Sequence, residues 1–160
     1  MIQLTDKVWI GDSDDGKYTD LVEPVVGAVL CVAQDLTPPN TRLWPTTEYA
    51  HVGLIDGPGN LPCAYIAAIV TLHLLLDRHP AVLVYCHGGG RALAVTLMYT
   101  ILRRGKVSDH STILNHWTPF DVALQYLRTS LGPSCYLPDV HPSHVEAFDK
   151  LPLSLLEVLV

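Results

Sequence analysis

The segment from Val82 to Arg91 constrains the fold of this chain more than any other. It reads Val-Leu-Val-Tyr-Cys-His-Gly-Gly-Gly-Arg, an apolar run that ends at Cys86 and is followed by three glycines. The residues after Arg91 are mostly apolar and contain no glycine or proline up to Arg104, which predicts a helix. A buried strand, a glycine loop and a helix in this order place the cysteine beside backbone N–H groups that can bind an anion.

This arrangement is suited to a cysteine that acts as a nucleophile. The positive end of the helix favours the thiolate of Cys86 over the thiol. Arg91 carries a planar fork of N–H donors that fits two oxygens of a phosphate-like group. The residues expected to bind the substrate through this loop are His87, Gly88, Gly89, Gly90 and Ala92.

Hydrophobic periodicity divides the rest of the chain into short strands and longer helices. The predicted strands are 7–11, paired with 2–4, and then 25–33, 49–55 and 81–85. The predicted helices are 17–22, 61–78, 91–104, one from Ser108 or Asp109 toward Trp117, 119–131 and 143–150. We therefore predict one α/β domain over residues 1–160, a three-layer sandwich with a mostly parallel central sheet of about four to five strands flanked by helices.

The bulk composition argues against several classes of protein. The formal net charge is −6, so we expect no binding of nucleic acid through its phosphates. No apolar run reaches membrane-spanning length and the N-terminus lacks the features of a signal peptide, so we expect a cytoplasmic protein that binds no membrane. The cysteines form no Cys-x-x-Cys pair, which argues against a zinc ribbon. We expect Cys31, Cys63 and Cys135 to be inert core residues.

A carboxylic acid follows another predicted strand. The strand at 49–55 ends at Asp56, which opens the loop Asp-Gly-Pro-Gly-Asn. Because ligands of open α/β sheets bind beyond the carboxyl ends of the strands, one pocket can hold both Asp56 and Cys86. Cys86 would attack a phosphorus atom while Asp56 protonates the leaving oxygen, and water would then hydrolyse the phosphocysteine with Asp56 as the base. This mechanism needs no metal and no cofactor.

Simpler interpretations are preferred for several other residues. His141 and His144 have no clear third ligand nearby in the sequence, so we expect surface histidines rather than a metal site, and their role stays open. Trp117 and Tyr126 stand at helical positions that predict core packing. The acidic segment 12–16 is expected to be a solvated polar turn.

Four stretches of the chain carry a resemblance to a known family. They are Val8-Trp-Ile-Gly, the strand 25–33, Leu54-Ile-Asp-Gly-Pro-Gly-Asn and Val82-Leu-Val-Tyr-Cys-His-Gly-Gly. From about Lys7 to about Phe148 the chain resembles the small dual-specificity branch of the cysteine-dependent protein tyrosine phosphatases. The thirty positions between Asp56 and Cys86 are similar to the interval between general acid and nucleophile in that family. The resemblance implies hydrolysis of phosphate monoesters of the phosphotyrosine, phosphoserine or phosphothreonine type.

The chain departs from the pattern of that family at three places. Tyr85 stands where the family has a histidine, and four residues rather than five separate Cys86 from Arg91. Ala92 replaces a hydroxyl residue that assists the departure of the thiolate in the second step. These departures imply slow hydrolysis of the phosphocysteine, and they leave open a second hypothesis, a phosphate-binding module that is catalytically weak.

The shortened loop also supports a third hypothesis. Residues 85–91, Tyr-Cys-His-Gly-Gly-Gly-Arg, are similar to the active loop of rhodanese-type sulfurtransferases. In such an enzyme Cys86 would carry a persulfide, and Asp56 would have no required role. The layout of the whole chain favours the phosphatase, because residues 92–160 show no strand of the kind that follows a rhodanese loop. The expected partner is a phosphorylated protein or a small phosphate monoester, and the oligomeric state stays open.

Overall fold

The structure is a computed structural model that describes residues 1–17, 26–37, 47–103 and 119–151. Its strands form one sheet of five, in the order β1-β2-β5-β3-β4. They are β1 (Ile2–Gln3), β2 (Val8–Gly11), β3 (Ala28–Ala33), β4 (Glu48–Leu54) and β5 (Val82–Tyr85). β1 is antiparallel to β2, and the remaining pairs are parallel, which confirms the predicted α/β class.

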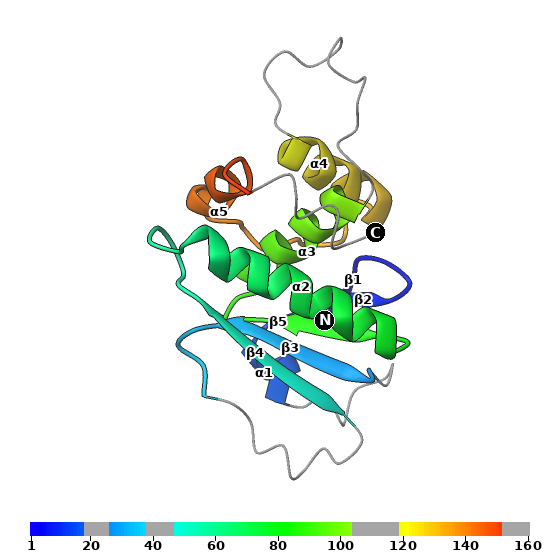
Figure 1. Cartoon of the computed structure of the whole chain (residues 1–160). Helices are drawn as coiled ribbons and strands as arrows, with labels where there is room; N and C mark the ends of the chain where they lie inside the picture. Colours follow the sequence, from blue (N-terminus) through cyan, green and yellow to red (C-terminus); the bar gives the residue numbers. More distant parts are fainter. Residues whose placement is uncertain (18–25, 38–46, 104–118, 152–160) are drawn as a thin grey trace.

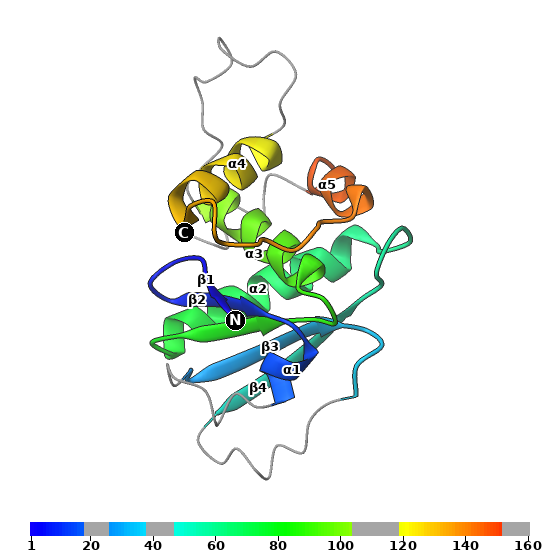
Figure 2. The same ribbon diagram turned by 180° about the vertical axis from the view of Figure 1, so that it is seen from behind.

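Helices flank the sheet on both faces (Figures 1 and 2). α2 (Pro62–Arg78) and α3 (Gly90–Arg103) pack against one face, and α1 (Ser13–Lys17) packs against the other. α4 (Pro119–Leu131) and α5 (Pro142–Phe148) lie on α3, on its side away from the sheet. The layered arrangement that the alternating pattern predicts is therefore present.

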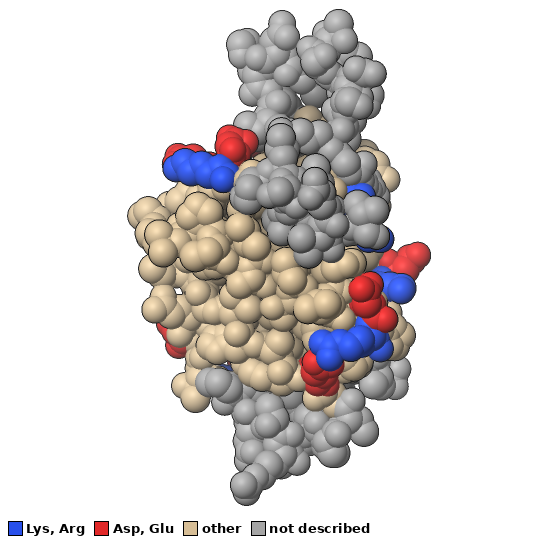
Figure 3. Space-filling model, in the orientation of Figure 1, with Lys and Arg blue, Asp and Glu red and all other residues tan. Residues whose placement is uncertain are grey.

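The core lies between the sheet and the α2–α3 layer. Every residue of β3 and β5 is buried, as expected for inner parallel strands covered on both faces. Figure 3 shows that charged side chains of the described residues lie mainly at the margins of the face seen in Figure 1. Among the described residues, no helix is both long and apolar enough to cross a bilayer.

The acidic segment 12–16 folds differently from the prediction. It contributes most of the short helix α1, because Oδ1 of Asp12 accepts hydrogen bonds from the N–H groups of Asp14 (2.9 Å) and Asp15 (3.0 Å). An aspartate in this position is a favourable N-terminal cap. The carboxylate of Asp15 also pairs with the N-terminal amino group at 2.8 Å, so the acidic side chains of this segment have structural partners.

Several side chains predicted to lie in the core are not buried, and some predicted helices lie outside the described residues. Tyr126 is exposed on α4, Cys63 is exposed on α2 and Cys135 is only half-buried, whereas Cys31 is buried as predicted. A helical position alone does not say which face meets the core, because that depends on what packs against the helix. The predicted helix toward Trp117 lies outside the described residues, as do positions 18–22 of the helix predicted at 17–22.

Candidate active site

Cys86 lies directly beyond the carboxyl end of β5, the central strand. β5 pairs with β2 on one side and with β3 on the other, so the residues that follow these strands gather at one edge of the sheet. The thiol of Cys86 is free and buried.

Tyr85, which precedes Cys86, packs its ring against Gly16 of α1, where any side chain would overlap the ring. Burial raises the pKa of Tyr85, and the neighbouring side chains of Tyr49 and Cys31 raise it further, so its phenol stays neutral.

The glycine loop (residues 87–90) links β5 to α3. Gly89 has a φ of 86°, in the left-handed region that favours glycine. Its carbonyl accepts a hydrogen bond of 2.8 Å from the N–H of Leu93 and so closes the first turn of α3. Within the described ranges, the N–H groups of residues 87–89 donate no hydrogen bond. Backbone N–H groups of this kind at a helix N-terminus can bind an anion, and this role of the loop stays a prediction.

Gly90 is required for a different reason. A Cβ atom at this position would overlap the carbonyl oxygen of Asp139, and one at Gly89 would lie 2.6 Å from the ring of Pro138. The segment that leads into α5 therefore packs directly against the glycine loop. A Cβ at Gly88 would meet nothing within 4 Å, so only part of the Gly-Gly-Gly run is fixed by packing.

Arg91 occupies the first turn of α3 and is buried. Its Nη1 donates to Oδ1 of Asp35 (2.8 Å) and to the carbonyl of Leu54 (2.7 Å). Its Nε and Nη2 are buried and make no hydrogen bond within the described residues. Burial disfavours the charge of Arg91, but Asp35 and the nearby Cys86 and Asp56 outweigh this effect and raise its pKa. One edge of the guanidinium is thus held by the protein, and the other edge is available for two oxygens of a ligand.

Asp56 stands in the acid loop (residues 55–60) that follows β4. The side chain of Asn60 closes this loop, since its Oδ1 accepts from the N–H of Ile55 (2.7 Å) and its Nδ2 donates to the carbonyls of Ile55 (2.9 Å) and Gly57 (3.1 Å). Oδ2 of Asp56 lies 3.9 Å from Nη2 of Arg91, and the side chain is 68% exposed. The fold therefore places Asp56 beyond the carboxyl end of β4, near Arg91, and its side chain is mostly exposed.

His87 and Ala92, which are also predicted to bind the substrate, lie in different surroundings. His87 is half-exposed, and its Nε2 lies 3.1 Å from Oδ2 of Asp35, so it stands at the rim of the site. Ala92 is fully buried in α3, where it contributes packing and no polar group. Its expected part in substrate binding stays a prediction, limited to its backbone.

Asp35 also belongs to this site, although it is not among the residues predicted from the sequence. It lies in the turn after β3, and its two carboxylate oxygens contact Arg91 and His87 separately. The hydrogen bond from Arg91 lowers the pKa of Asp35. Burial opposes this effect, and the charges of Arg91 and His87 add smaller contributions that lower the pKa. The signal was present in the sequence, because Asp35, like Asp56 and Cys86, comes one or two residues after a parallel strand.

The expectation that His144 lies at the surface is wrong. It is 1% exposed, and its Nδ1 forms a hydrogen bond of 2.6 Å with the hydroxyl of Tyr65 on α2. Burial lowers the pKa of His144, and the nearby charges of His141 and Arg91 act in the same direction against that of Asp56. His141 is exposed and accepts a hydrogen bond from the N–H of Ser143, which caps α5. The pair therefore packs and caps α5.

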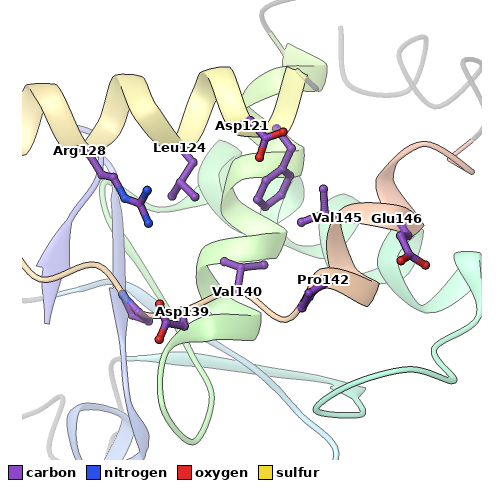
Figure 4. A pocket seen from close by; sticks show the side chains of 10 residues that line it. Asp121, Leu124, Arg128, Asp139, Val140, Pro142, Val145 and Glu146 are labelled. Carbon is purple, nitrogen blue, oxygen red and sulfur yellow. The ribbon is translucent and has the colours of Figure 1, made fainter. Parts of the chain in front are cut away.

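Two hollows adjoin these elements. Figure 4 shows the larger one, a groove of about 400 Å³ between α4, α5 and the segment that leads into α5. It includes none of the predicted site residues. The smaller one, of about 200 Å³, lies between the acid loop and α5 and is lined by Gly57–Asn60 and by Glu146 and Lys150, among others. The smaller hollow likewise includes none of the predicted site residues. Each hollow borders the site through one segment: the smaller through the acid loop, and the larger through Pro138 and Asp139, which pack against the glycine loop.

Comparisons with known proteins identify the fold. No protein-family model and no curated protein matches the sequence. Among solved structures, human DUSP28 is 16% identical, with 99% of this chain and 97% of that chain covered and a TM-score of 0.67. A mouse putative dual-specificity phosphatase in complex with zinc tungstate is 18% identical, with 92% and 83% covered and a TM-score of 0.68. The tyrosine phosphatase OH1 from the Orf virus is 17% identical, with 100% and 86% covered and a TM-score of 0.61.

These similarities extend over nearly the whole chain but at low identity, so they concern the arrangement of the backbone. They agree with the sheet order, the flanking helices and the strand–loop–helix unit described above. The chain has the fold of the dual-specificity and tyrosine phosphatases.

Proposed function

We propose that this chain is a cysteine-dependent phosphatase that hydrolyses phosphate monoesters through a phosphocysteine on Cys86. One observation carries the proposal: the buried guanidinium of Arg91 has an edge that makes no hydrogen bond to any described residue, at the same end of the sheet as Cys86 and Asp56. Buried N–H donors without acceptors are energetically unfavourable unless a ligand supplies the acceptors. A phosphate group supplies two oxygens in the geometry that matches this edge of the guanidinium.

In the first step, the thiolate of Cys86 attacks the phosphorus of the substrate. A sulfur–phosphorus bond forms as the bond from phosphorus to the leaving oxygen breaks, and Asp56 gives its proton to that oxygen. The N–H groups of the glycine loop and the guanidinium of Arg91 stabilise the three equatorial oxygens. The free alcohol or phenol departs.

In the second step, a water molecule attacks the phosphocysteine. Asp56, now a carboxylate, takes a proton from the water, the sulfur–phosphorus bond breaks, and inorganic phosphate leaves with Cys86 restored as a thiolate. The exposure of Asp56 allows water to reach it once the first product has left. Apart from the substrate and this water molecule, both steps use groups of this chain.

The proposed substrate is a phosphorylated protein side chain or a small phosphate monoester. Phosphotyrosine, phosphoserine and phosphothreonine share the dianionic group that Arg91 and the loop would bind. The solved structures named above include dual-specificity and tyrosine phosphatases, which supports this substrate class and does not favour the sulfurtransferase hypothesis.

Hydrolysis of p-nitrophenyl phosphate at mildly acidic to neutral pH tests the proposal. We expect multiple turnovers by the wild type, none by Cys86→Ser, and a loss of about 10²-fold or more in Asp56→Asn, in line with general acid catalysis. Cys63→Ser is the matched control, because Cys63 is an exposed cysteine on α2 and its replacement should change nothing. Equal turnover by Cys86→Ser and the wild type would refute the proposal.

Ala92 supports a second candidate function, a phosphate-binding protein with little turnover. It offers no hydroxyl to assist the thiolate as it leaves in the second step. The same assay separates the two functions. A burst of about one p-nitrophenol per protein molecule followed by a stall would show that Cys86 is a competent nucleophile and that hydrolysis of the phosphocysteine fails.

A further inference from the structure

Three neighbouring parallel strands each deliver one functional group to the site. Cys86 follows β5, Asp35 follows β3 and Asp56 follows β4, and these strands are adjacent in the order β5-β3-β4. Two carboxylates and one buried cation, Arg91, therefore share a small volume. The mechanism above uses Asp56 and leaves Asp35 without a role.

The two carboxylates contact Arg91 in different ways. Asp35 forms a direct hydrogen bond of 2.8 Å to Nη1, and the same nitrogen also donates to the carbonyl of Leu54. Asp56 approaches Nη2 only to 3.9 Å, beyond hydrogen-bond distance. Asp35, which is hydrogen-bonded to Arg91, is therefore not the carboxylate that we propose as the general acid.

A general acid gains nothing from a tight bond to a buried guanidinium. A carboxylate held there would be stabilised in its charged form and turned away from the leaving oxygen. A buried arginine nevertheless needs a counter-charge, because an unpaired buried charge is strongly destabilising. Asp35 supplies that charge at Nη1, whereas Asp56 lies nearest to Nη2. The second carboxylate oxygen of Asp35 is 3.1 Å from Nε2 of His87.

We propose that Asp35 is a positioning residue that serves as the resident counter-ion of Arg91 and thereby keeps Asp56 free to act as the general acid. This inference rests on the proposed function and deepens it. It predicts that removal of the Asp35 charge draws Asp56 onto Arg91, so that the acid is lost although Asp56 itself is unchanged.

The kinetic test compares two substrates, p-nitrophenyl phosphate with a good leaving group and phenyl phosphate with a poor one. Loss of the general acid harms the poor leaving group more, since that oxygen needs the proton more. In Asp35→Asn we expect the ratio of kcat/KM for p-nitrophenyl phosphate to that for phenyl phosphate to rise by at least about tenfold, part of the ~10²–10⁴-fold that an acid contributes. Asp6→Asn, which removes an exposed carboxylate near the N-terminus, should keep the wild-type ratio.

A conservative variant keeps the test valid if Asp35→Asn fails to fold. Asp35→Glu retains a carboxylate for Arg91, and we expect it to keep the wild-type ratio. An equal loss for both substrates in Asp35→Asn would overturn the proposal, because Asp35 would then only orient Arg91. A ratio in Asp35→Glu as high as in Asp56→Asn would overturn it as well.

A measurement without turnover separates this inference from the proposed function. In the wild-type background, Asp56→Asn should leave the urea midpoint of unfolding nearly unchanged, because Asp56 is mostly exposed and makes no hydrogen bond to Arg91. In the Asp35→Asn background, the same substitution should lower the midpoint clearly, because Asp56 has become the counter-ion. Additive effects would contradict the inference even if the wild type proves active, and a coupled effect would support it even if no phosphatase activity is found.

Discussion

Tyr65 on α2 and His144 on α5 share a buried hydrogen bond of 2.6 Å, and each residue is only 1% exposed. Tyr65→Phe removes the hydroxyl alone and leaves Nδ1 of His144 without a partner. Nε2 of the same ring is buried and makes no hydrogen bond within the described residues, so the whole imidazole would be unsatisfied. Because an unsatisfied buried polar group costs about 1–3 kcal/mol, we expect Tyr65→Phe to lower the free energy of unfolding by about 2 kcal/mol.

Urea and thermal unfolding measure this loss directly. In a domain of this size, 1 kcal/mol corresponds to about 2–4 °C, so Tm should fall by about 4–8 °C. The urea midpoint should fall while the slope of the transition stays the same, because the surface exposed on unfolding hardly changes. Tyr136→Phe is the matched control: Tyr136 is 78% exposed, and its replacement should change the stability by less than about 0.5 kcal/mol.

The double variant Tyr65→Phe/His144→Leu decides whether the hydrogen bond itself is responsible. When both partners become apolar no polar group is left unsatisfied, so the double variant should lose less stability than the sum of the single variants, by about 1–2 kcal/mol. If the two losses simply add, or if Tyr65→Phe is as harmless as Tyr136→Phe, the assignment of this bond is wrong.

Two further predictions concern acidic pH and the glycine loop. Because burial lowers the pKa of His144 below its ordinary value of 6.5, the unfolded chain binds this proton more readily, and stability should fall as the pH drops through the folded-state pKa. Melting curves over a pH series should show this fall in the wild type and a smaller one in His144→Leu. Gly90→Ala should cost about 1–3 kcal/mol because its Cβ would overlap the carbonyl of Asp139, whereas Gly88→Ala has open space and should unfold like the wild type.

The neighbourhood of Cys86 could be predicted from the sequence to within about a residue. The strand was expected at 81–85 and is found at Val82–Tyr85, and the helix expected from 91 begins at Gly90. The signals there are local: an apolar run, three glycines and an unbroken helical segment follow one another. The position of Asp56 was predictable for the same kind of reason, since a Gly-Pro-Gly loop ends its strand.

Burial was predicted less well, because it depends on what each side chain meets. His144 is predicted at the surface but is buried, with a hydrogen bond to Tyr65 of α2, whereas Tyr126 is predicted in the core but is exposed. Helix α1 was expected to be a turn, since the cap that Asp12 provides looks in sequence like any acidic loop. The proposed catalytic and binding roles of the site residues remain predictions that the assays above will test.

The sequence by itself determined the α/β class, the order of the elements, the cysteine loop and the acid loop, because strand, helix and turn preferences act between residues close along the chain. Only the tertiary structure decided which polar and charged side chains pair with one another. Asp35 and Arg91 are 56 positions apart, and Tyr65 and His144 are 79 positions apart. Such pairs form because parallel strands end at the same edge of a sheet and helices pack across it, and no local pattern contains that information.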